Sequence, residues 1–368
     1  MAARPATHRR AERTLDGSQR PAVRDLGRGS STFTIEWDVR SAFDFLFSLA
    51  GEAGSTDDLP AEDRRWLTDA KASLPEETRT ELAKLFDSEL CINSGVLLID
   101  RPDVRTSADV VELIAGSEPR DLLRPMFEYH ANDLQIGDLI EQALAGDMSV
   151  LPAIEERLPD WNRDGRLGLL KDPAGSRDRI ASVLRAWQKA FVEIEPRVEQ
   201  ILERDYDGRA DDRRALAATD LIEATTGGIR WLPEPGVRRA ILGPSYFARP
   251  YNFLMSGNDW RYFGYPVADA ALDPTDSLAA PQSVVRLHRA LGDATRLKIL
   301  KLLASRDLYL TEIAQLLDLS KPTIKHHLAQ LRSAGLVTIT ESGTVLYYTL
   351  RRNRLDDASA EIKRFLIG

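Results

Sequence analysis

The sequence holds one cysteine, Cys91, and five histidines among 368 residues. A single thiol excludes an intrachain disulfide framework and a metal centre built from several cysteines, and it favours a reducing compartment. Only His130 lies in the acidic middle of the chain, which excludes a multi-histidine metal centre there. No run approaches the roughly 18 apolar residues of a membrane span, and the Arg-rich N-terminus lacks the apolar segment of a secretory signal. We therefore expect a cytoplasmic protein with no membrane partner.

Signatures of catalysis are also missing. The chain has no Gly-x-Ser-x-Gly, no Walker A loop, no Gly-x-Gly-x-x-Gly and no His-Glu-x-x-His. Glu128, His130 and Asp133 are close enough in sequence for an acid–base cluster, but an exposed or hydrogen-bonded histidine is the simpler interpretation. Nothing fixes Cys91 near His130 as a nucleophile pair. We expect no enzyme activity, no catalytic residues and no cofactor.

The charge is unevenly distributed. Residues 281–368 hold 14 Lys and Arg against 8 Asp and Glu, a net charge of +6. Residues 1–30 hold 7 Arg against 3 acidic residues, a net charge of +4, which leaves −18 for the middle of a chain whose total is −8. Such asymmetry indicates that the basic C-terminal part meets a polyanion. Residues 1–30 have no apolar period and predict a disordered basic tail, or an artefact of a misplaced start codon.

The pattern of apolar residues predicts an α+β protein with a mostly helical N-terminal domain and a β-rich segment near 228–266. We predict an acidic α+β sensor or assembly domain over 31–268, a linker over 269–280 with several prolines and serines, and a basic module over 281–368. By contrast, the prolines and glycines of residues 151–176 predict an irregular connection.

An apolar seam with heptad-like spacing precedes the β-rich segment. Its members recur at intervals of four and three residues: Ile180, Leu184, Trp187, Phe191, Ile194, Val198 and Ile201. Packing on the domain's own core is the simpler interpretation, and an intermolecular coiled coil is the alternative. Pro196 lies inside the seam, so we expect a kink or a helix restart there.

The C-terminal module has the clearest local signals. A short helix over 283–291 is followed by a helix starting at Asp293 and a third starting at Thr311. Ser320 is a good N-cap for a fourth helix, which Gly335 ends. Two alternating runs over 336–340 and 345–350 flank a Glu-Ser-Gly-Thr turn and predict a hairpin. This order predicts a winged helix-turn-helix.

The helix over 320–334 is the predicted recognition element. Its buried face is formed by Ile324, Leu328 and Leu331, so His326 and Gln330 point away from the core. His326 is either a DNA contact or a solvated side chain, and His327 is a packing residue or a phosphate contact. The predicted DNA-binding residues are Ser320, Lys321, Thr323, Lys325, His326, Gln330, Arg332, Arg351 and Arg352.

These segments resemble the ArsR-type (arsenic-repressor-like) winged-helix regulators. The resemblance rests on Leu291-Gly-Asp-Ala-Thr-Arg-Leu-Lys-Ile-Leu300, Thr311-Glu-Ile-Ala-Gln-Leu-Leu317, Ser320-Lys-Pro-Thr-Ile-Lys-His-His-Leu328 and Leu331-Arg-Ser-Ala-Gly-Leu-Val337. It covers about residues 281–350 and implies a homodimer that binds an operator, usually as a repressor released by a signal.

The chain departs from this family where metals are sensed. The stretch before the third helix, Asp307–Thr311, has no thiol, and Leu355–Phe365 has carboxylates but no histidine. Carboxylates alone are poor ligands for soft ions, so we expect no metal site. The wing tip offers Glu341 and Thr344 where a basic residue is common, which weakens minor-groove reading by the wing.

The region in front of the module resembles the front domain of long ArsR-type regulators, through the helix over 184–205 and the Pro244-Ser245-Tyr246-Phe247 turn. Aromatic residues are dense here. A small-molecule effector pocket is one interpretation, and packing in the core or against a partner is the other. The candidate pocket residues are Trp231, Tyr246, Tyr251, Trp260, Tyr262 and Tyr265.

From these features we expect a DNA-binding transcriptional regulator that acts as a repressor. It would bind a palindromic operator in double-stranded DNA as a homodimer, while the front domain senses a non-metal signal. The alternative is a protein-interaction scaffold whose acidic front domain binds a partner and whose DNA contact is secondary.

Overall fold

The computed structural model describes residues 33–49, 58–85, 93–127, 135–158, 163–272, 280–342 and 345–367. Within these ranges the protein mixes helices and strands and ends in a helix-turn-helix domain, which confirms the predicted fold class. The tail predicted for residues 1–30 lies outside the described residues, as do Cys91, Glu128, His130 and Asp133.

The elements up to residue 272 form the front part of the chain. Its strands are β1 (Thr34–Trp37), β2 (Ile229–Arg230), β3 (Arg239–Ser245), β4 (Phe253–Ser256) and β5 (Trp260–Pro266). Short 3-10 turns are η2 (Gly95–Leu98), η3 (Met148–Val150) and η4 (Asp269–Ala271). Its helices are α1 (Ser41–Phe47), α2 (Ala61–Ser73), α3 (Glu76–Leu85), α5 (Ser107–Gly116), α6 (Pro119–Met126), α8 (Gly137–Leu144), α9 (Leu151–Arg157), α10 (Arg163–Lys171), α11 (Pro173–Gly208), α12 (Ala210–Ala215) and α13 (Ala218–Thr225).

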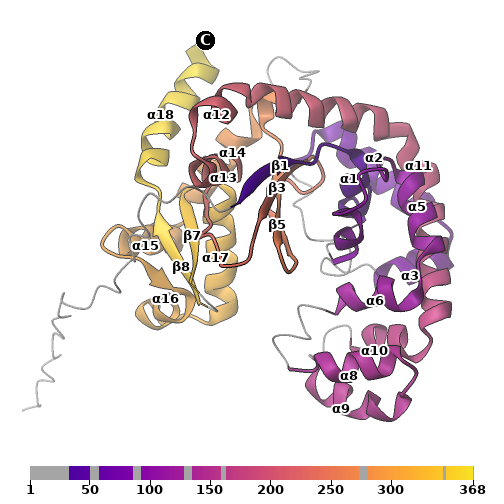
Figure 1. Ribbon diagram of the computed structural model, residues 1–368. Helices are drawn as coiled ribbons and strands as arrows, with labels where there is room; N and C mark the ends of the chain where they lie inside the picture. Colours follow the sequence, from indigo (N-terminus) through magenta and orange to yellow (C-terminus); the bar gives the residue numbers. More distant parts are fainter. Residues whose placement is uncertain are drawn as a thin grey trace, which may run out of the picture.

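Helix α11 spans 36 residues and organises the front part. It begins where the Asp172 side chain accepts a hydrogen bond from the Gly175 backbone N–H, and it runs along the outer edge of the helical region to α12 (Figure 1). The apolar seam is buried in the front core, which confirms the packing interpretation. Pro196 neither ends nor restarts the helix. Its ring lies on the exposed side, so the missing N–H leaves no unsatisfied backbone group in the core.

The irregular connection predicted for residues 151–176 is wrong. Helices α9 and α10 and the start of α11 occupy most of this stretch. Pro152 and Pro173 lie in the first turns of α9 and α11. Backbone N–H groups in a first turn have no partner within the helix, so proline loses no hydrogen bond there. At these two positions proline marks the start of a helix and does not interrupt one.

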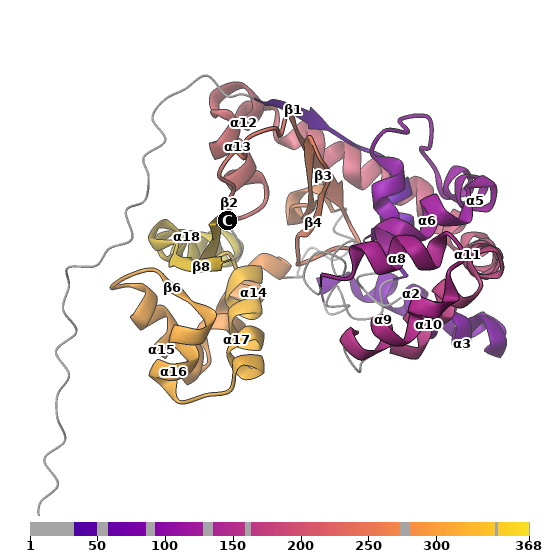
Figure 2. The same cartoon turned by 60° about the horizontal axis from the view of Figure 1, so that its bottom comes forward.

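A mixed sheet separates two cores of the front part. Its strand order is β1-β3-β5-β4, with β1 and β5 parallel to β3 and β4 antiparallel to β5. Alternation along the strands sends Ile241 and Tyr262 into the large core under α1 and α11. Leu242 and Tyr265 point the opposite way, into a smaller core with α13. Figure 2 shows the sheet between the helical region and the C-terminal module.

The C-terminal module has its own apolar core, drawn from residues between Leu287 and Tyr348. Asp293 and Ser320 cap helices as predicted, each accepting from a backbone N–H three residues on, and Gly335 follows the fourth helix with φ of 70°. The elements are α14 (Gln282–Leu291), α15 (Ala294–Leu303), β6 (Leu308–Tyr309), α16 (Leu310–Leu317), α17 (Lys321–Ser333), β7 (Val337–Ser342), β8 (Val345–Leu350) and α18 (Arg352–Ile367).

A strand from the front part completes the sheet of the wing. The order is β2-β7-β8-β6, and β2 pairs in parallel with β7, Ile229 opposite Ile339. The front part and the module therefore share a hydrogen-bonded sheet in addition to their covalent connection.

Gly243 in β3 gives a test of the front sheet. A Cβ built at this position would lie 2.0 Å from the Tyr262 hydroxyl oxygen, and Tyr262 is itself fully buried. We expect Gly243→Ala to lower the free energy of unfolding by about 1–3 kcal/mol, because the buried ring must move. Urea denaturation followed by tryptophan fluorescence measures the change.

Gly168 in α10 is the matched control, because among the described residues no atom beyond the adjacent backbone of α10 lies within 4 Å of a Cβ built there. Gly168→Ala should leave stability unchanged or raise it by up to about 1 kcal/mol, since alanine favours a helix interior. A Gly243→Ala protein as stable as the Gly168→Ala protein would contradict the position of the Tyr262 ring.

Candidate nucleic-acid interface

Helix α17 separates an apolar face from a polar one. Ile324, Leu328 and Leu331 are buried in the core of the module. Lys321, Thr323, Lys325 and His326 are exposed. The apolar residues hold the helix against α14, α15 and α16, so the polar face is presented to solvent along the first two turns.

The start of α17 is fixed by a small hydroxyl pair. Ser320 Oγ accepts from the Thr323 backbone N–H at 3.3 Å and lies 2.7 Å from Thr323 Oγ1. Pro322 occupies the first turn, as expected where no N–H is needed. The two lysines at 321 and 325 therefore flank a rigid helix N-terminus, which itself favours anions.

The polar face also contains a hydrogen-bonded chain that sequence reasoning missed. Arg296 of α15 donates to Gln330 Oε1, and the Gln330 amide nitrogen lies 2.9 Å from His326 Nε2. Gln330 is only half-buried and His326 is exposed. The signal for Arg296 was present in the Asp-Ala-Thr-Arg run, but its target on α17 follows only from helix packing.

His327 lies on the flank of α17, beside the start of α15. Its Nδ1 is 3.9 Å from Asp293 Oδ1, and burial lowers the pKa of the imidazole. The pKa of Asp293 is lowered chiefly by the hydrogen bond from the Arg296 backbone N–H. His327 therefore packs between α17 and the start of α15, which agrees with the packing interpretation.

The three arginines among the predicted DNA-binding residues lie against other parts of the protein. Arg332 is half-buried beside Tyr251 and Tyr348, and burial lowers its pKa. Arg351 Nη1 donates to the carbonyl oxygens of Gly227 at 2.6 Å and Gly335 at 3.4 Å.

The third of these residues, Arg352, is exposed, but its guanidinium donates to the Ala304 carbonyl. The structure thus groups Ser320, Lys321, Thr323, Lys325 and His326 on one surface and directs Arg332 and Arg351 toward the front part. Thr344 and the side chain of Glu341 at the wing tip lie outside the described residues.

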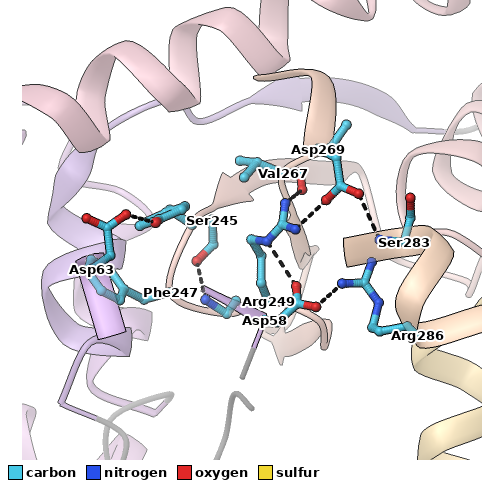
Figure 3. A network of polar contacts seen from close by, with 12 residues as sticks. Asp58, Asp63, Ser245, Phe247, Arg249, Val267, Asp269, Ser283 and Arg286 are labelled. Atoms are coloured by element: carbon cyan, nitrogen blue, oxygen red, sulfur yellow. Dashed lines mark hydrogen bonds and ion pairs between the residues drawn. The ribbon is translucent and has the colours of Figure 1, made fainter. Parts of the chain in front are cut away.

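A buried ion network joins the front part to the first helix of the module (Figure 3). The Arg249 guanidinium, 1% exposed, binds Asp58 at 3.0 Å, Asp269, and the Val267 carbonyl at 2.6 Å. Asp58 also pairs with Arg286 of α14. Asp269 accepts from the Ser283 backbone N–H at 2.8 Å, at the start of the same helix.

The six aromatic residues proposed as one pocket do not converge. Tyr246, Trp260 and Tyr262 are buried in the large front core, whereas Trp231 and Tyr265 are buried in the smaller core across the sheet. The sixth, Tyr251, is half-buried near Arg332. The six side chains therefore do not line one pocket, because alternation along β5 sends Tyr262 and Tyr265 to opposite faces of the sheet.

The residues that the structure describes offer neither a metal-binding cluster nor a membrane-spanning helix. Within those ranges no group of three or more His, Cys, Asp and Glu side chains is placed to hold a metal ion. No helix in the same ranges is long and apolar enough to cross a membrane.

Comparison with known proteins places the similarity in the module. The family model described as "Bacterial regulatory protein, arsR family" matches residues 293–338. The HTH-type transcriptional regulator KmtR of Mycobacterium tuberculosis is 38% identical over 72 residues, which are 20% of this chain and 55% of KmtR. The transcriptional repressor SdpR of Bacillus subtilis is 39% identical over 72 residues, which are 20% of this chain and 80% of SdpR.

A further relative, the HTH-type transcriptional regulator CmtR of Mycobacterium tuberculosis, is 34% identical over 86 residues, which are 23% of this chain and 73% of CmtR. The chain thus spans little more than half the length of KmtR and most of SdpR and CmtR, while the similarity occupies about a fifth of its own length.

The ion network predicts an unequal response to two similar substitutions. Asp58→Asn removes a buried countercharge from Arg249 and should lower the free energy of unfolding by about 3 kcal/mol. Asp103→Asn removes an exposed partner of Arg101, with both side chains about half exposed or more, and should leave the free energy of unfolding nearly unchanged. Chemical denaturation of both variants measures the difference, and equal values would contradict the buried network.

Proposed function

Because the chain belongs to the ArsR family of bacterial regulatory proteins, we propose that it is a transcriptional repressor that binds operator DNA through α17. The observation that carries the proposal is the exposed face of Lys321, Thr323, Lys325 and His326, held on a helix whose other side is buried. Such a helix inserts its N-terminal half into the major groove, where lysines bind phosphates and polar side chains contact base edges.

We propose that the DNA-binding form is a homodimer, with each copy contacting one half of a palindromic operator. The support is an unpaired apolar end on α18, where Phe365, Leu366 and Ile367 are 36%, 69% and 83% exposed. Helix α18 lies against α14, whose Leu287 is fully buried. A second copy of α18 would cover this apolar end on the side away from α17.

We propose that residues 31–268 form the sensor of a non-metal signal and that 281–368 form the DNA-binding domain, joined by the linker 269–280. The Arg249 network and the β2–β7 pairing support this assignment of roles, because both connect the front part directly to the module. A signal that binds the front part acts on DNA affinity only if it favours one arrangement of these contacts.

The lysines of α17 give a direct test. Duplex binding by the full chain should weaken steeply with salt, because bound lysines release counterions from phosphates. In a filter-binding assay over a range of salt, Lys321→Ala and Lys325→Ala should each reduce the slope of log affinity against log salt by about 1. Lys189→Ala, at an exposed position on α11, is the control and should leave the slope unchanged. Equal slopes in all four proteins would refute the interface.

The apolar end of α18 gives a second test. Leu366→Glu with Ile367→Glu should convert a dimer to a monomer at micromolar concentration, as measured by light scattering, and should weaken operator binding. Leu254→Glu on β4 is the control, because Leu254 is 51% exposed yet lies in the front sheet. A wild-type monomer, or a dimer that survives both charges, would exclude this interface.

A further inference from the structure

Arg296 ties three helices of the module together. Its Nε donates to the Ala290 carbonyl at 2.8 Å and its Nη2 to the Arg289 carbonyl at 2.6 Å, both in the last turn of α14. Its Nη1 donates to the side chain of Gln330 on α17. A guanidinium has only donors, so the atom of Gln330 that faces it must be the amide oxygen.

The orientation of the Gln330 amide decides the tautomer of His326. With its oxygen held by Arg296, Gln330 turns its amide nitrogen toward His326 Nε2, 2.9 Å away. The amide nitrogen only donates, so Nε2 must accept. A neutral imidazole carries a single proton, which therefore lies on Nδ1.

The outer edge of His326 is then a fixed hydrogen-bond donor. The side chain is exposed on the polar face of α17, and among the described residues its Nδ1 has no hydrogen-bond partner. In the major groove guanine presents two neighbouring acceptors, N7 and O6, whereas cytosine presents a donor. Adenine places an N6 donor beside its single acceptor, and thymine has a single acceptor, O4, beside its methyl group.

On the basis of the proposed function, we propose that His326 reads guanine through Nδ1–H and that Arg296 is the positioning residue that fixes this donor through Gln330. The Gln330 amide is engaged with Arg296 through its oxygen and with His326 through its nitrogen, so the proposal gives Gln330 a supporting role in place of the bidentate contact that glutamine makes with adenine.

The tautomer is measurable in the full chain without DNA. Nitrogen-15 NMR of the imidazole, recorded above the ordinary histidine pKa of about 6.5, distinguishes protonated from unprotonated ring nitrogens. The His326 signals are assigned by their loss in His326→Asn. We expect Nδ1 protonated in the wild type and a mixture of tautomers in Arg296→Met. A protonated Nε2 in the wild type would overturn the proposal.

Base preference is measured by selecting bound duplexes from a random library. The wild type should select guanine at one position of each half-site. Asparagine places its amide nitrogen near the position of Nδ1, so His326→Asn should retain that preference. Glutamine places it near Nε2, so His326→Gln should lose the preference by roughly tenfold. A guanine preference that is undiminished in His326→Gln would also overturn the proposal.

Arg296→Met separates positioning from general folding. It should weaken the preference at the His326 position alone, while the salt slope and the other selected positions stay as in the wild type. Arg296→Lys is the second variant, because it keeps the charge but cannot bind Gln330 and two carbonyls together. Preferences unchanged in both variants would exclude a positioning role. If the wild type retains no duplex, the proposed function fails, whereas duplex binding without a guanine preference overturns the role of His326 alone.

Discussion

The burial of the Arg249 guanidinium is the constraint on which the link between the two parts of the protein depends. A guanidinium cannot lose its charge at any accessible pH, so a side chain that is 1% exposed requires partners for its donors. Asp58, Asp269 and the Val267 carbonyl meet this requirement. The same two carboxylates hold Arg286 and the Ser283 N–H of α14. The two carboxylates that neutralise Arg249 therefore also hold α14 in place.

The segment that carries Arg249 is itself anchored deep in the front core. Asp44 is fully buried, which raises its pKa to about 6, and it accepts from Ser245 Oγ at 2.7 Å and from the Phe247 backbone N–H at 2.8 Å. A few residues further on, Tyr251 lies beside Arg332 of α17. One short stretch between β3 and β4 therefore connects the centre of the front core with both α14 and α17.

The second connection runs through the wing. Parallel pairing of β2 with β7 adds a front strand to the wing sheet, and Arg351 binds the Gly227 carbonyl just before that strand. The two connections contact the module at α14 and at β7, and both of these elements pack against α17. Under the proposed function, a change in the front part would reach α17 through these two sets of contacts.

The sequence was sufficient for the features that depend on near neighbours along the chain. Asp293, Ser320 and Gly335 bound their helices as predicted, because a cap acts within three or four residues. The buried stripe of Ile324, Leu328 and Leu331 followed from the period of the helix. For the same reason His326 lies on the exposed face of the helix, as predicted.

Only the tertiary structure decided where the long polar side chains end. Arg351 meets Gly227 across 124 positions of sequence, and Arg249 meets Asp58 across 191. The aromatics of β5 divided between two cores because helices cover both faces of the sheet, which no local pattern reveals. A guanidinium reaches several ångströms from its backbone, and its partner is set by which elements pack nearby. Local spacing therefore determined the faces of the helices, and packing determined which of their charged groups remain free to meet DNA.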